Sequence, residues 1–452
     1  MTVASEAEVR AALTSGAEEA RTVLEELVRI PSISAAPEHA ADVDAVIARV
    51  AELARQAGAA GVETVRSGNG QPALIARWPG PAGAPTVLLY AHADVQPTGP
   101  VEEWTSAPFD ATERGGRLYG RGAADDKAGV AMHLAVLRAF AGDHPVGVVL
   151  FVEGEEEIGS PTLPTLLREH RDKLASDVIV IADSANAATD IPALTTSLRG
   201  LVDALVEVRM LERPVHSGVY GGPVGDALTA LCRLLATLHD SSGDVAIQGL
   251  HAAAAKAPDV PEETWRADAG LLPGVQLMGT GSIPDRTWMR PAVSVLAIDA
   301  PATHQASNVL LPRARAVVSL RLAPGEDAHA AMKSLGAHLE AHAPWGAHVS
   351  VTPGAIGEPF ALETIGPAYD VARGAFADAY GNAVVEMGTG GSIPFIAEFA
   401  RAYPDAAVLV TGVGDPESRW HGIDESLHLG MWHTAAVAEA LLLLRLGDAL
   451  RR

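Results

Sequence analysis

The chain has 452 residues, and 56 Asp and Glu against 33 Lys and Arg give a formal net charge of −23. This length favours two domains over one, and a hydrophobic share of 48% predicts a large core rather than a disordered chain. Because an acidic surface repels phosphate groups, we expect neither nucleic acid nor an anionic membrane as a partner.

The N-terminal segment has neither the basic nor the apolar region of a signal peptide. No uninterrupted apolar run approaches the roughly 18 residues that a membrane span needs. The single cysteine, Cys232, rules out an intrachain disulfide, which fits a reducing compartment. We therefore expect a cytoplasmic protein.

Helical patterns open the chain, and apolar runs then alternate with further helical patterns, as expected for a mostly parallel sheet. Four runs are nearly continuous in apolar residues, as strands buried on both faces should be. The helical patterns span 17–30 and 39–58, the four apolar runs span 86–94, 146–154, 177–183 and 406–414, and a long apolar helix is expected at 427–446. We predict an α/β catalytic domain with helices on both faces of this sheet.

The middle of the chain has a different pattern. Alternating strands (LVDALVEVRM, AVSVLAID, ARAVVSLRL and AHVSVTP) accompany two helical patterns at 224–239 and 326–342. This predicts a smaller α+β domain inserted into the larger one. The expected boundaries give a catalytic domain at 1–197 and 358–452, and an inserted domain at 198–357.

Polar residues stand where the apolar runs end. These are His92 and Asp94 after the first run, Glu155, Glu156 and Glu157 after the second, Asp183 at the end of the third, and His421 a few residues after the fourth. Ligands of open α/β sheets bind at the carboxyl ends of the strands, so such residues are candidates for a site.

Each pattern alone also has a simpler interpretation. His92 can end a strand beside Asp94 by chance, and Asp125 or Asp126 in GRGAADDKAG can cap the helix that follows. An acidic run is usually a solvated loop, and a lone histidine such as His421 is more often structural than a ligand.

Together, the five segments provide two histidines and three carboxylates without cysteine. Such mixed nitrogen and oxygen donors favour zinc, with manganese or cobalt as alternatives. Two metal ions about 3.5–4 Å apart would activate a bridging water and polarise a carbonyl group.

Several motifs then point to a known family. They are LLYAHADVQP, W-x-x-x-PF, LYGRGAADDKAG, EGEEEIGSP, LRG, HSG, SLRL, GGSIP and the late His421. The chain resembles the dinuclear zinc exopeptidase and amidohydrolase family that includes carnosine dipeptidases, succinyl-diaminopimelate desuccinylase and aminoacylase. YAHADVQP and EGEEEIGSP are most similar to the dipeptidase branch.

The resemblance implies two divalent metal ions per subunit and a role for each matching residue. His92 and Asp183 would bind one ion, Glu157 and His421 the other, and Asp125 would bridge both; Asp94 would orient His92, Glu156 would be the general base, and Glu155 would have no role. It also implies a cis peptide bond between Asp125 and Asp126.

For the inserted domain, the resemblance implies a lid that also forms a homodimer. His216 in HSG would stabilise the oxyanion in the partner subunit's site, and Arg321 in SLRL would hold the substrate carboxylate. Gly391 and Ser392 in GGSIP would form a substrate-binding loop, and Asn308 would contact the substrate. Without the resemblance, His216 reads as an exposed turn histidine and Arg321 as a surface charge.

The predicted function is hydrolysis of the amide bond of dipeptides or small peptides by a water that bridges two metals, with Glu156 as base. The alternative is an N-acyl-amino-acid amidohydrolase or desuccinylase with the same metal centre. Ala93 replaces the larger aromatic residue frequent in the dipeptidase branch, so substrate preference is less defined than the reaction. A non-catalytic binding protein of this fold would be expected to lose ligands or the base, and this chain retains all of them.

Overall fold

A computed structural model describes residues 4–390 and 394–452, and their contacts divide them into two compact units. Unit 1 contains the described parts of 1–196, 363–387 and 393–452, and unit 2 contains those of 197–362 and 388–392. The expected boundary at 357/358 lies five residues before the division at 362/363.

The short segment at 388–390 differs from the expectation, which placed it in the catalytic domain. It packs within unit 2, where the amide of Arg199 donates to the carbonyl oxygen of Thr389 (3.2 Å). A Cβ atom on Gly388 would lie 2.6 Å from Cβ of Trp288, so glycine permits this close approach.

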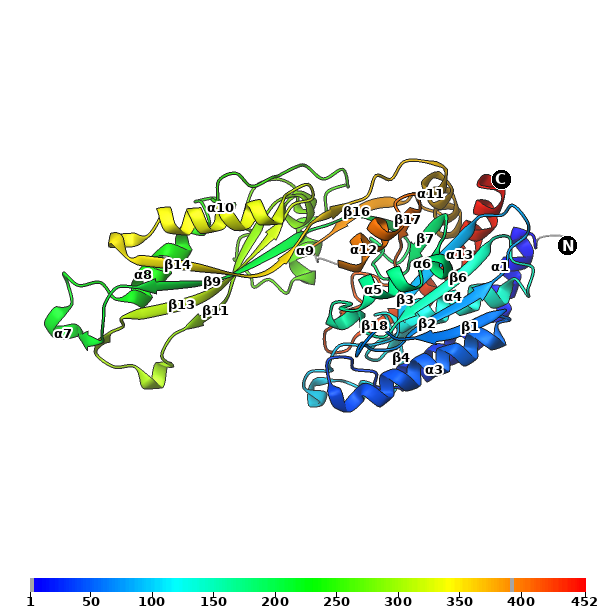
Figure 1. The fold of residues 1–452 in the computed structure, drawn as a ribbon, viewed down its shortest axis with the longest axis horizontal. Coiled ribbons are helices and arrows are strands. Elements are labelled where there is room, and N and C mark those ends of the chain that lie inside the picture. The colour runs from blue at the N-terminus through cyan, green and yellow to red at the C-terminus, as the bar shows by residue number, and fades with distance from the viewer. Residues whose placement is uncertain (1–3, 391–393) are drawn as a thin grey trace. The chain divides into compact units, whose positions relative to one another are not determined.

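Unit 1 contains a six-stranded sheet in the order β1-β2-β6-β3-β7-β17 (Figure 1). The strands are β1 (Gly61–Val65), β2 (Ala73–Trp78), β3 (Thr86–His92), β6 (Gly147–Glu153), β7 (Val178–Ile181) and β17 (Ala407–Val410). The strands β6, β3, β7 and β17 are parallel, and β1 and β2 form an antiparallel edge. The predicted mostly parallel sheet is confirmed.

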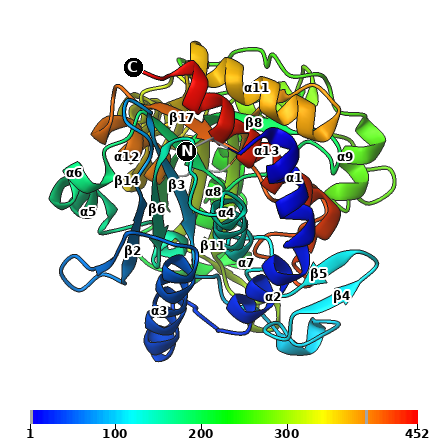
Figure 2. The ribbon, with the colours of Figure 1, turned by 90° about the vertical axis from the view of Figure 1, so that its right-hand side faces the viewer.

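Helices cover both faces of this sheet (Figure 2). Residues of β3 alternate between the two: Leu89 belongs to the large core beneath α4, whereas Tyr90 faces the other side and stacks on Phe395 of α12 at 4.6 Å. The helices are α2 (Ala17–Val28), α3 (Ala40–Gln56), α4 (Lys127–Ala139), α5 (Leu163–Glu169), α6 (Arg171–Leu174), α11 (Pro367–Tyr380), α12 (Pro394–Ala402) and α13 (Leu429–Ala449).

The first helix of unit 1 was not among the predicted segments. The helix α1 (Glu6–Ser15) begins with a capping box, in which Ser5 and Glu8 each satisfy the backbone amide of the other. Its buried side chains, Val9 and Leu13, are too few to give a long apolar pattern.

One helix of unit 1 meets the length and composition of a membrane span, although it contains no uninterrupted apolar run of that length. The helix α13 has 21 residues and is apolar enough by composition, but 72% of its most apolar window is buried within the protein. It is interrupted by Glu439, which pairs with His133 of α4 inside the core (2.8 Å). The long apolar helix expected at 427–446 is therefore confirmed as α13, and Glu439 explains why it contains no uninterrupted apolar run of that length.

A small sheet joins two loops of unit 1. It contains β4 (Thr112–Arg114), β5 (Arg117–Tyr119) and β18 (Ser426–His428) in the order β18-β5-β4. Because β5 precedes the GRGAADDKAG segment and β18 follows SRWHGIDES, their pairing brings these two motifs together.

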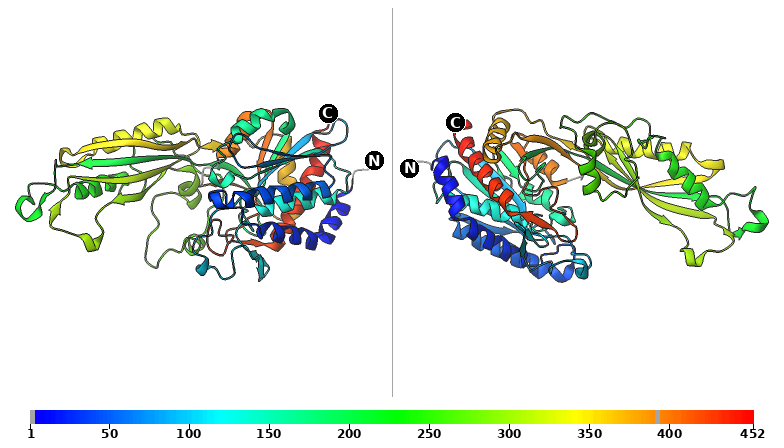
Figure 3. Two further views of the ribbon diagram at one scale, coloured as in Figure 1. Left: turned by 60° about the horizontal axis from the view of Figure 1, so that its bottom comes forward. Right: turned by 180° about the vertical axis from the view of Figure 1, so that it is seen from behind.

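Unit 2 is built on an antiparallel sheet in the order β11-β13-β9-β14. Its strands are β9 (Gly200–Arg209), β11 (Ala292–Asp299), β13 (Arg313–Leu322) and β14 (His348–Gly357). Every second residue of β9 from Val202 to Val208 is buried against α8 (Ala227–Leu235) and α10 (Ala328–Ala341). Figure 3 shows α10 running along this sheet.

Smaller elements complete the fold. In unit 2, β10 (Val215–His216) pairs with β12 (Val309–Leu310), and the short helices α7 (Ser217–Tyr220) and α9 (Glu262–Asp268) lie in its loops. The divisions between the units fall within β8 (Ala193–Leu198) and β16 (Val385–Thr389), which share a sheet with β15 (Phe360–Ala361).

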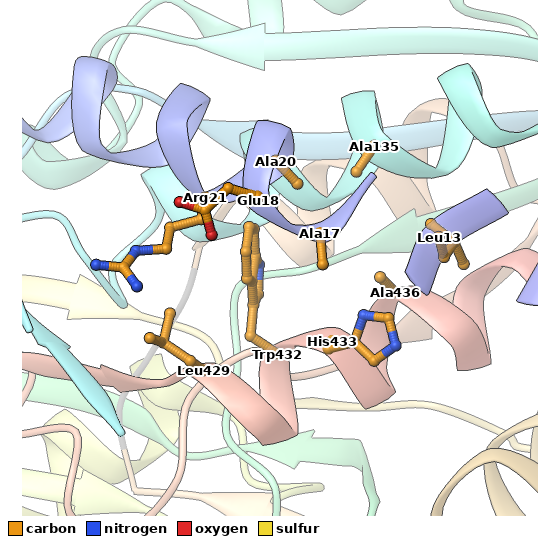
Figure 4. Close-up of a pocket in the computed structure, with 10 residues that line it drawn as sticks. All are labelled: Leu13, Ala17, Glu18, Ala20, Arg21, Ala135, Leu429, Trp432, His433 and Ala436. Atoms are coloured by element: carbon orange, nitrogen blue, oxygen red, sulfur yellow. The ribbon is translucent and has the colours of Figure 1, made fainter. Parts of the chain in front are cut away.

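A mainly apolar pocket lies between α1, α2, α4 and α13 of unit 1 (Figure 4). Its lining includes Leu13, Ala17, Ala135, Trp432 and Ala436. The predicted site residues are not among those that line it, so its location does not support a role in the predicted chemistry.

Candidate metal centre

Two histidines and one aspartate form the middle of a cluster in unit 1. His92 is the last residue of β3, and its Nε2 lies 3.0 Å from Oδ1 of Asp125. The other oxygen of Asp125, Oδ2, lies 2.9 Å from Nε2 of His421. One carboxylate therefore faces both imidazoles, as required of a ligand that bridges two metal ions.

The remaining carboxylates lie on the two sides of this bridge. Oδ1 of Asp183 is 3.9 Å from Nε2 of His92, and Oε2 of Glu157 is 3.2 Å from Nε2 of His421. Glu156 is 4.0 Å from the same atom of His92. Two groups of three residues each place their ligand atoms within 4.8 Å of one another. One group is His92, Glu156 and Asp183, and the other is His92, Asp125 and Glu157.

The electrostatics of this cluster reflect crowded like charges. Burial and the charges of Asp183 and Glu157 raise the pKa of Glu156 well above its usual range. Burial raises the pKa of Asp183 to about 7, and hydrogen bonds to Asp125 and Glu157 raise the pKa of His421 to about 10. The clustered carboxylates favour positive charge, and with two imidazoles they match the donor set of divalent metal ions.

Two Asp residues in GRGAADDKAG have separate contacts, and the peptide bond between them is cis, as the resemblance implies. Asp126 caps α4, since its Oδ1 accepts from the amide of Gly129 (3.2 Å). Its Oδ2 accepts from the amide of His92 (3.3 Å). The helix-capping interpretation thus applies to Asp126, and Asp125 lies in the cluster.

Asp94 connects two segments of the site. The ring Nδ1 of His92 lies 3.0 Å from the backbone oxygen of Asp94 and 3.4 Å from Oδ1 of its carboxylate. That carboxylate also accepts from the backbone amides of Glu156 (3.1 Å) and Glu157 (3.0 Å). Asp94 therefore contacts the ring of His92 and also holds the turn that carries both glutamates.

Glu155, for which no role was predicted, is buried and points elsewhere. Its carboxylate accepts from the backbone amides of Gln71 (2.9 Å) and Thr162 (2.8 Å). It stabilises the loops on either side of the acidic run, which a sequence pattern of three adjacent glutamates does not reveal.

Gln96 was part of a quoted motif but received no role. Its backbone amide donates to Oε1 of Glu157 (3.1 Å). Its side-chain Nε2 donates to Oε2 of Glu157 (2.9 Å) and to the backbone oxygen of the same residue (3.0 Å). Gln96 thus surrounds the carboxylate that faces His421.

A buried ion pair was also missed. Oε2 of Glu425 lies 2.6 Å from Nη1 of Arg121, and both side chains are almost fully buried. Oε1 of Glu425 accepts from the amides of Ala124 (2.9 Å) and Asp125 (3.1 Å). Nη2 of Arg121 donates to the carbonyl of Gly422, next to His421 (3.2 Å). The pair fixes the loops of Asp125 and His421. Because its two residues lie about 300 positions apart in the sequence, no local pattern indicates that they are paired.

The backbone at His421 has a φ of 59°, in the left-handed region that residues other than glycine rarely adopt. Arg419 and Asp424 in the same loop also have positive φ values, of 54° and 57°. Such conformations often occur at functional sites, where the surrounding contacts maintain them.

The predicted residues of unit 2 form two groups. His216 is exposed, and its Nδ1 accepts from the amide of Gly218 (3.0 Å). The backbone oxygen of Asn308 accepts from the amide of Ser217 (2.9 Å), so Asn308 and His216 are neighbours. Arg321 lies near the end of β13, opposite Leu201 of β9. Gly391 and Ser392 lie outside the described residues.

Arg199, the arginine of the LRG motif, lies in the same region as Arg321. Burial and the charge of Arg321 lower the pKa of Arg199 to about 10. Its Nε is buried without a hydrogen-bond partner among the described residues. Two neighbouring guanidinium groups favour an anion between them.

These geometric observations can now be compared with known proteins. The family model described as Peptidase family M20/M25/M40 matches residues 88–445. The chain belongs to this family. A cysteinylglycine-S-conjugate dipeptidase from Corynebacterium striatum is 40% identical over 371 residues, which cover 80% of this M20 peptidase and 82% of the relative. A β-Ala-His dipeptidase from Mus musculus is 31% identical over 321 residues, covering 66% and 65%.

The fold agrees with this assignment. The crystal structure of human carnosine dipeptidase 1 matches with a TM-score of 0.81 at 25% identity, covering 99% of this M20 peptidase and all of that chain. The predicted resemblance to the dipeptidase branch is confirmed, and so is the prediction of a metal-dependent peptidase. The identity of the metal and the role of each residue remain predictions.

Proposed function

We propose that this M20 peptidase hydrolyses the peptide bond of unblocked dipeptides at a centre of two divalent metal ions in unit 1. The observation that carries the proposal is the position of Asp125, whose two oxygens face His92 and His421 at 3.0 and 2.9 Å. The similarity to a cysteinylglycine-S-conjugate dipeptidase and a β-Ala-His dipeptidase supports a dipeptide as substrate.

The proposed ligands are shared between two positions. His92 and Asp183 would hold one ion, Glu157 and His421 would hold the other, and Asp125 would contact both. Nitrogen and carboxylate donors without cysteine favour zinc, with manganese or cobalt as alternatives. When bound, such ions polarise the scissile carbonyl and lower the pKa of the attacking water towards 7.

Glu156 is the proposed general base. Because burial and neighbouring carboxylates raise its pKa, this side chain has a higher proton affinity than an ordinary glutamate. It takes a proton from the attacking water and delivers it to the leaving amine. The amide of Glu156 donates to Asp94, which keeps the base at the edge of the cluster (3.1 Å).

Unit 2 supplies the proposed substrate contacts. Arg321 binds the carboxylate of the dipeptide, and the adjacent charge of Arg199 supports an anion there. His216 stabilises the oxyanion, with Asn308 beside it. Gly391 and Ser392 complete the substrate loop in this proposal.

The positions of His216 and Arg321 support a homodimer. His216 pairs with β12, just before β13 begins, and Arg321 lies near the other end of β13. Eight residues of strand span roughly 25 Å, whereas a dipeptide spans roughly 7 Å. This separation supports the proposal that His216 acts in the site of a partner copy rather than beside Arg321 of its own chain.

The edge strand β11 is a suitable surface for such a dimer. Val295, Leu296 and Ile298 are 42%, 61% and 43% exposed on this strand. An exposed apolar edge favours pairing with a second chain. For location, we propose the cytoplasm, consistent with a chain whose single cysteine excludes an intrachain disulfide.

The experiment that tests this function compares substrates in the presence of Zn²⁺ or Mn²⁺. Mass spectrometry follows unblocked dipeptides, β-alanyl dipeptides, N-acetyl amino acids and N-succinyl-diaminopimelate, with and without a chelator. We expect the unblocked dipeptides to be cleaved and the chelator to abolish cleavage. Glu156→Gln should lower kcat by about 10²–10⁴-fold, whereas Glu102→Gln, at an exposed glutamate of the same unit, should not.

Other outcomes would revise the proposal. Cleavage of the acylated compounds alone would identify an N-acyl-amino-acid amidohydrolase with the same metal centre. No turnover by the metal-loaded protein would contradict the enzymatic function and favour a binding protein of this fold.

A further inference from the structure

The two proposed metal positions differ in what surrounds their carboxylates. Glu157 receives a hydrogen bond on each oxygen from a single residue, Gln96. Within residues 4–390 and 394–452, no hydrogen-bond donor contacts the carboxylate of Asp183, the matching ligand of the other position. The side chain of Glu157 is 3% exposed, so Gln96 largely replaces water around it.

Gln96 is itself held by the backbone on both sides. The amide of Val95 donates to the carbonyl of Ser32 (2.9 Å), and Nη2 of Arg121 donates to the carbonyl of Pro97 (3.2 Å). Pro97 also restricts the backbone of Gln96 to extended conformations. These contacts fix the segment, so the amide of Gln96 meets Glu157 in one arrangement.

The contacts of Gln96 also determine the orientation of Glu157. A free glutamate side chain samples several rotamers, and each sampled rotamer that misses the metal lowers its affinity. Three hydrogen bonds from one residue to the carboxylate and backbone oxygen of Glu157 select the rotamer that faces His421 at 3.2 Å. Residues that orient ligands in this way commonly tune metal affinity.

We infer that Gln96 is a positioning residue for Glu157, and that it sets the affinity of the metal position formed by Glu157 and His421 without setting that of the other. This inference rests on the proposed dinuclear centre. The glutamine of the DVQP motif would thus act by orienting one metal ligand, Glu157, and not by contacting the substrate.

The test measures metal retention rather than activity alone. Wild-type protein and Gln96→Met, which keeps the side-chain length but removes the amide, are loaded with Co²⁺ and titrated with a chelator. The absorption spectrum and the metal content per chain follow the two ions separately. We expect one ion of Gln96→Met to be lost at about 10- to 100-fold lower chelator concentration, and the other to be retained as in the wild type.

Further variants separate positioning from general damage to the loop. Gln96→Asn keeps an amide but is one methylene too short to make both contacts, and it should weaken the same ion. Adding Gln96→Met to Glu157→Gln should cause no further loss, because both changes act on one ligand. Gln248→Met is the matched control, since the amide of Gln248 donates only to the carbonyl of Ala246 in unit 2 (3.5 Å).

Three results would overturn the inference. Unchanged retention in both Gln96 variants, or equal weakening of both ions, would show that Gln96 does not act through Glu157. An additive loss in the double variant would show the same. Fewer than two ions on the wild-type protein would instead contradict the dinuclear centre itself, and the role of Gln96 with it.

Discussion

Glu153 is a buried carboxylate at the end of β6 that stands apart from the proposed ligands. The hydroxyl of Tyr90 donates to its Oε2 (2.8 Å), and its Oε1 has no hydrogen-bond partner among the described residues. Burial raises the pKa of Glu153 to about 8, and the charges of Asp94 and Glu155 add to the effect. The neutral form is therefore the one the fold favours.

This pKa predicts how stability depends on pH. Because the folded pKa lies above the unfolded value of 4.5, the folded state binds more protons between pH 4.5 and about 8, and stability falls as pH rises through this window. Glu153→Gln should remove this loss while keeping the contact with Tyr90. We expect the free energy of unfolding of the variant, relative to that of the wild type, to rise by more than about 1 kcal/mol between pH 5 and pH 8.

The measurement is urea unfolding of the two chelator-treated proteins at several pH values. A constant difference in the free energy of unfolding across the window would contradict the prediction. Glu102→Gln, at an exposed position, is the control for a general effect of removing one carboxylate.

The sequence indicated which residues are candidates for the site, but it did not indicate which residues contact them. His92, Asp183 and His421 could be proposed because each ends or follows an apolar run, and Asp125 because GRGAADDKAG places two adjacent Asp residues before a helix. The roles of Gln96, and of Glu155 as a buried loop residue, could not, because they depend on hydrogen bonds between residues 61 to 84 positions apart. Such contacts leave no periodic pattern in the chain.

At the scale of elements, the loop that leads into β18 and the loop before α4 are joined by the pair of Arg121 and Glu425. Both groups are buried, so neither is screened by water when its partner is lost. The pair also supports backbone amides, including that of Asp125. Stability and the metal centre therefore depend on the same contact.

We predict that Glu425→Gln lowers the free energy of unfolding by about 3–5 kcal/mol, because it leaves the charge of Arg121 buried without a negatively charged partner. Urea unfolding measures this change. The exposed pair of Lys173 and Glu63 is the contrast, and Lys173→Met should cost less than about 1 kcal/mol. An equal cost for the two pairs would contradict the importance of burial.

A double variant tests the reason for this cost. Arg121→Met in the background of Glu425→Gln removes the unpaired charge and should restore part of the lost stability. The restoration should be incomplete, since the amides of Ala124 and Asp125 would still lack their carboxylate acceptor.

The apolar strands of the parallel sheet were predictable from sequence, and the three-residue strands were not. The strands β3, β6 and β7 appeared as apolar runs because a parallel sheet buries both faces of its strands. Three-residue strands such as β5 and β18 offer too few residues for any alternation to show. Their pairing, which brings Asp125 and His421 together, depends on the packing of the surrounding loops.

At the scale of the whole molecule, the chain alternates between units. Unit 2 is formed by a continuous insertion together with the short segment at 388–390. The insertion was predictable because its amphipathic strands differ from the fully apolar strands of unit 1. The return of a few residues near 388 was not, because it depends on close contacts of Gly388 with Trp288 and Ser197.

The proposed exchange of His216 between subunits predicts complementation. Co-expression of Glu156→Ala and His216→Ala chains should restore activity that each variant lacks alone. Random pairing gives a mixed dimer in half of the molecules, with one complete site in each, so we expect about a quarter of wild-type activity. Activity assays measure the recovered activity, and chromatography of the co-expressed chains measures the fraction of mixed dimer. No recovery in a confirmed mixed dimer would place His216 in the site of its own chain.

All the proposed metal ligands belong to unit 1, and the proposed substrate contacts belong to unit 2. Apart from His216, the proposed chemistry and the choice of substrate are thus encoded in separate stretches of the polypeptide. Mutations in the insertion at positions other than His216 can alter which dipeptides are accepted while the hydrolytic machinery is preserved. Laboratory evolution of new specificity would accordingly do best to randomise residues of 197–362 other than His216, together with the proposed substrate loop of Gly391 and Ser392, and to leave the metal ligands unchanged.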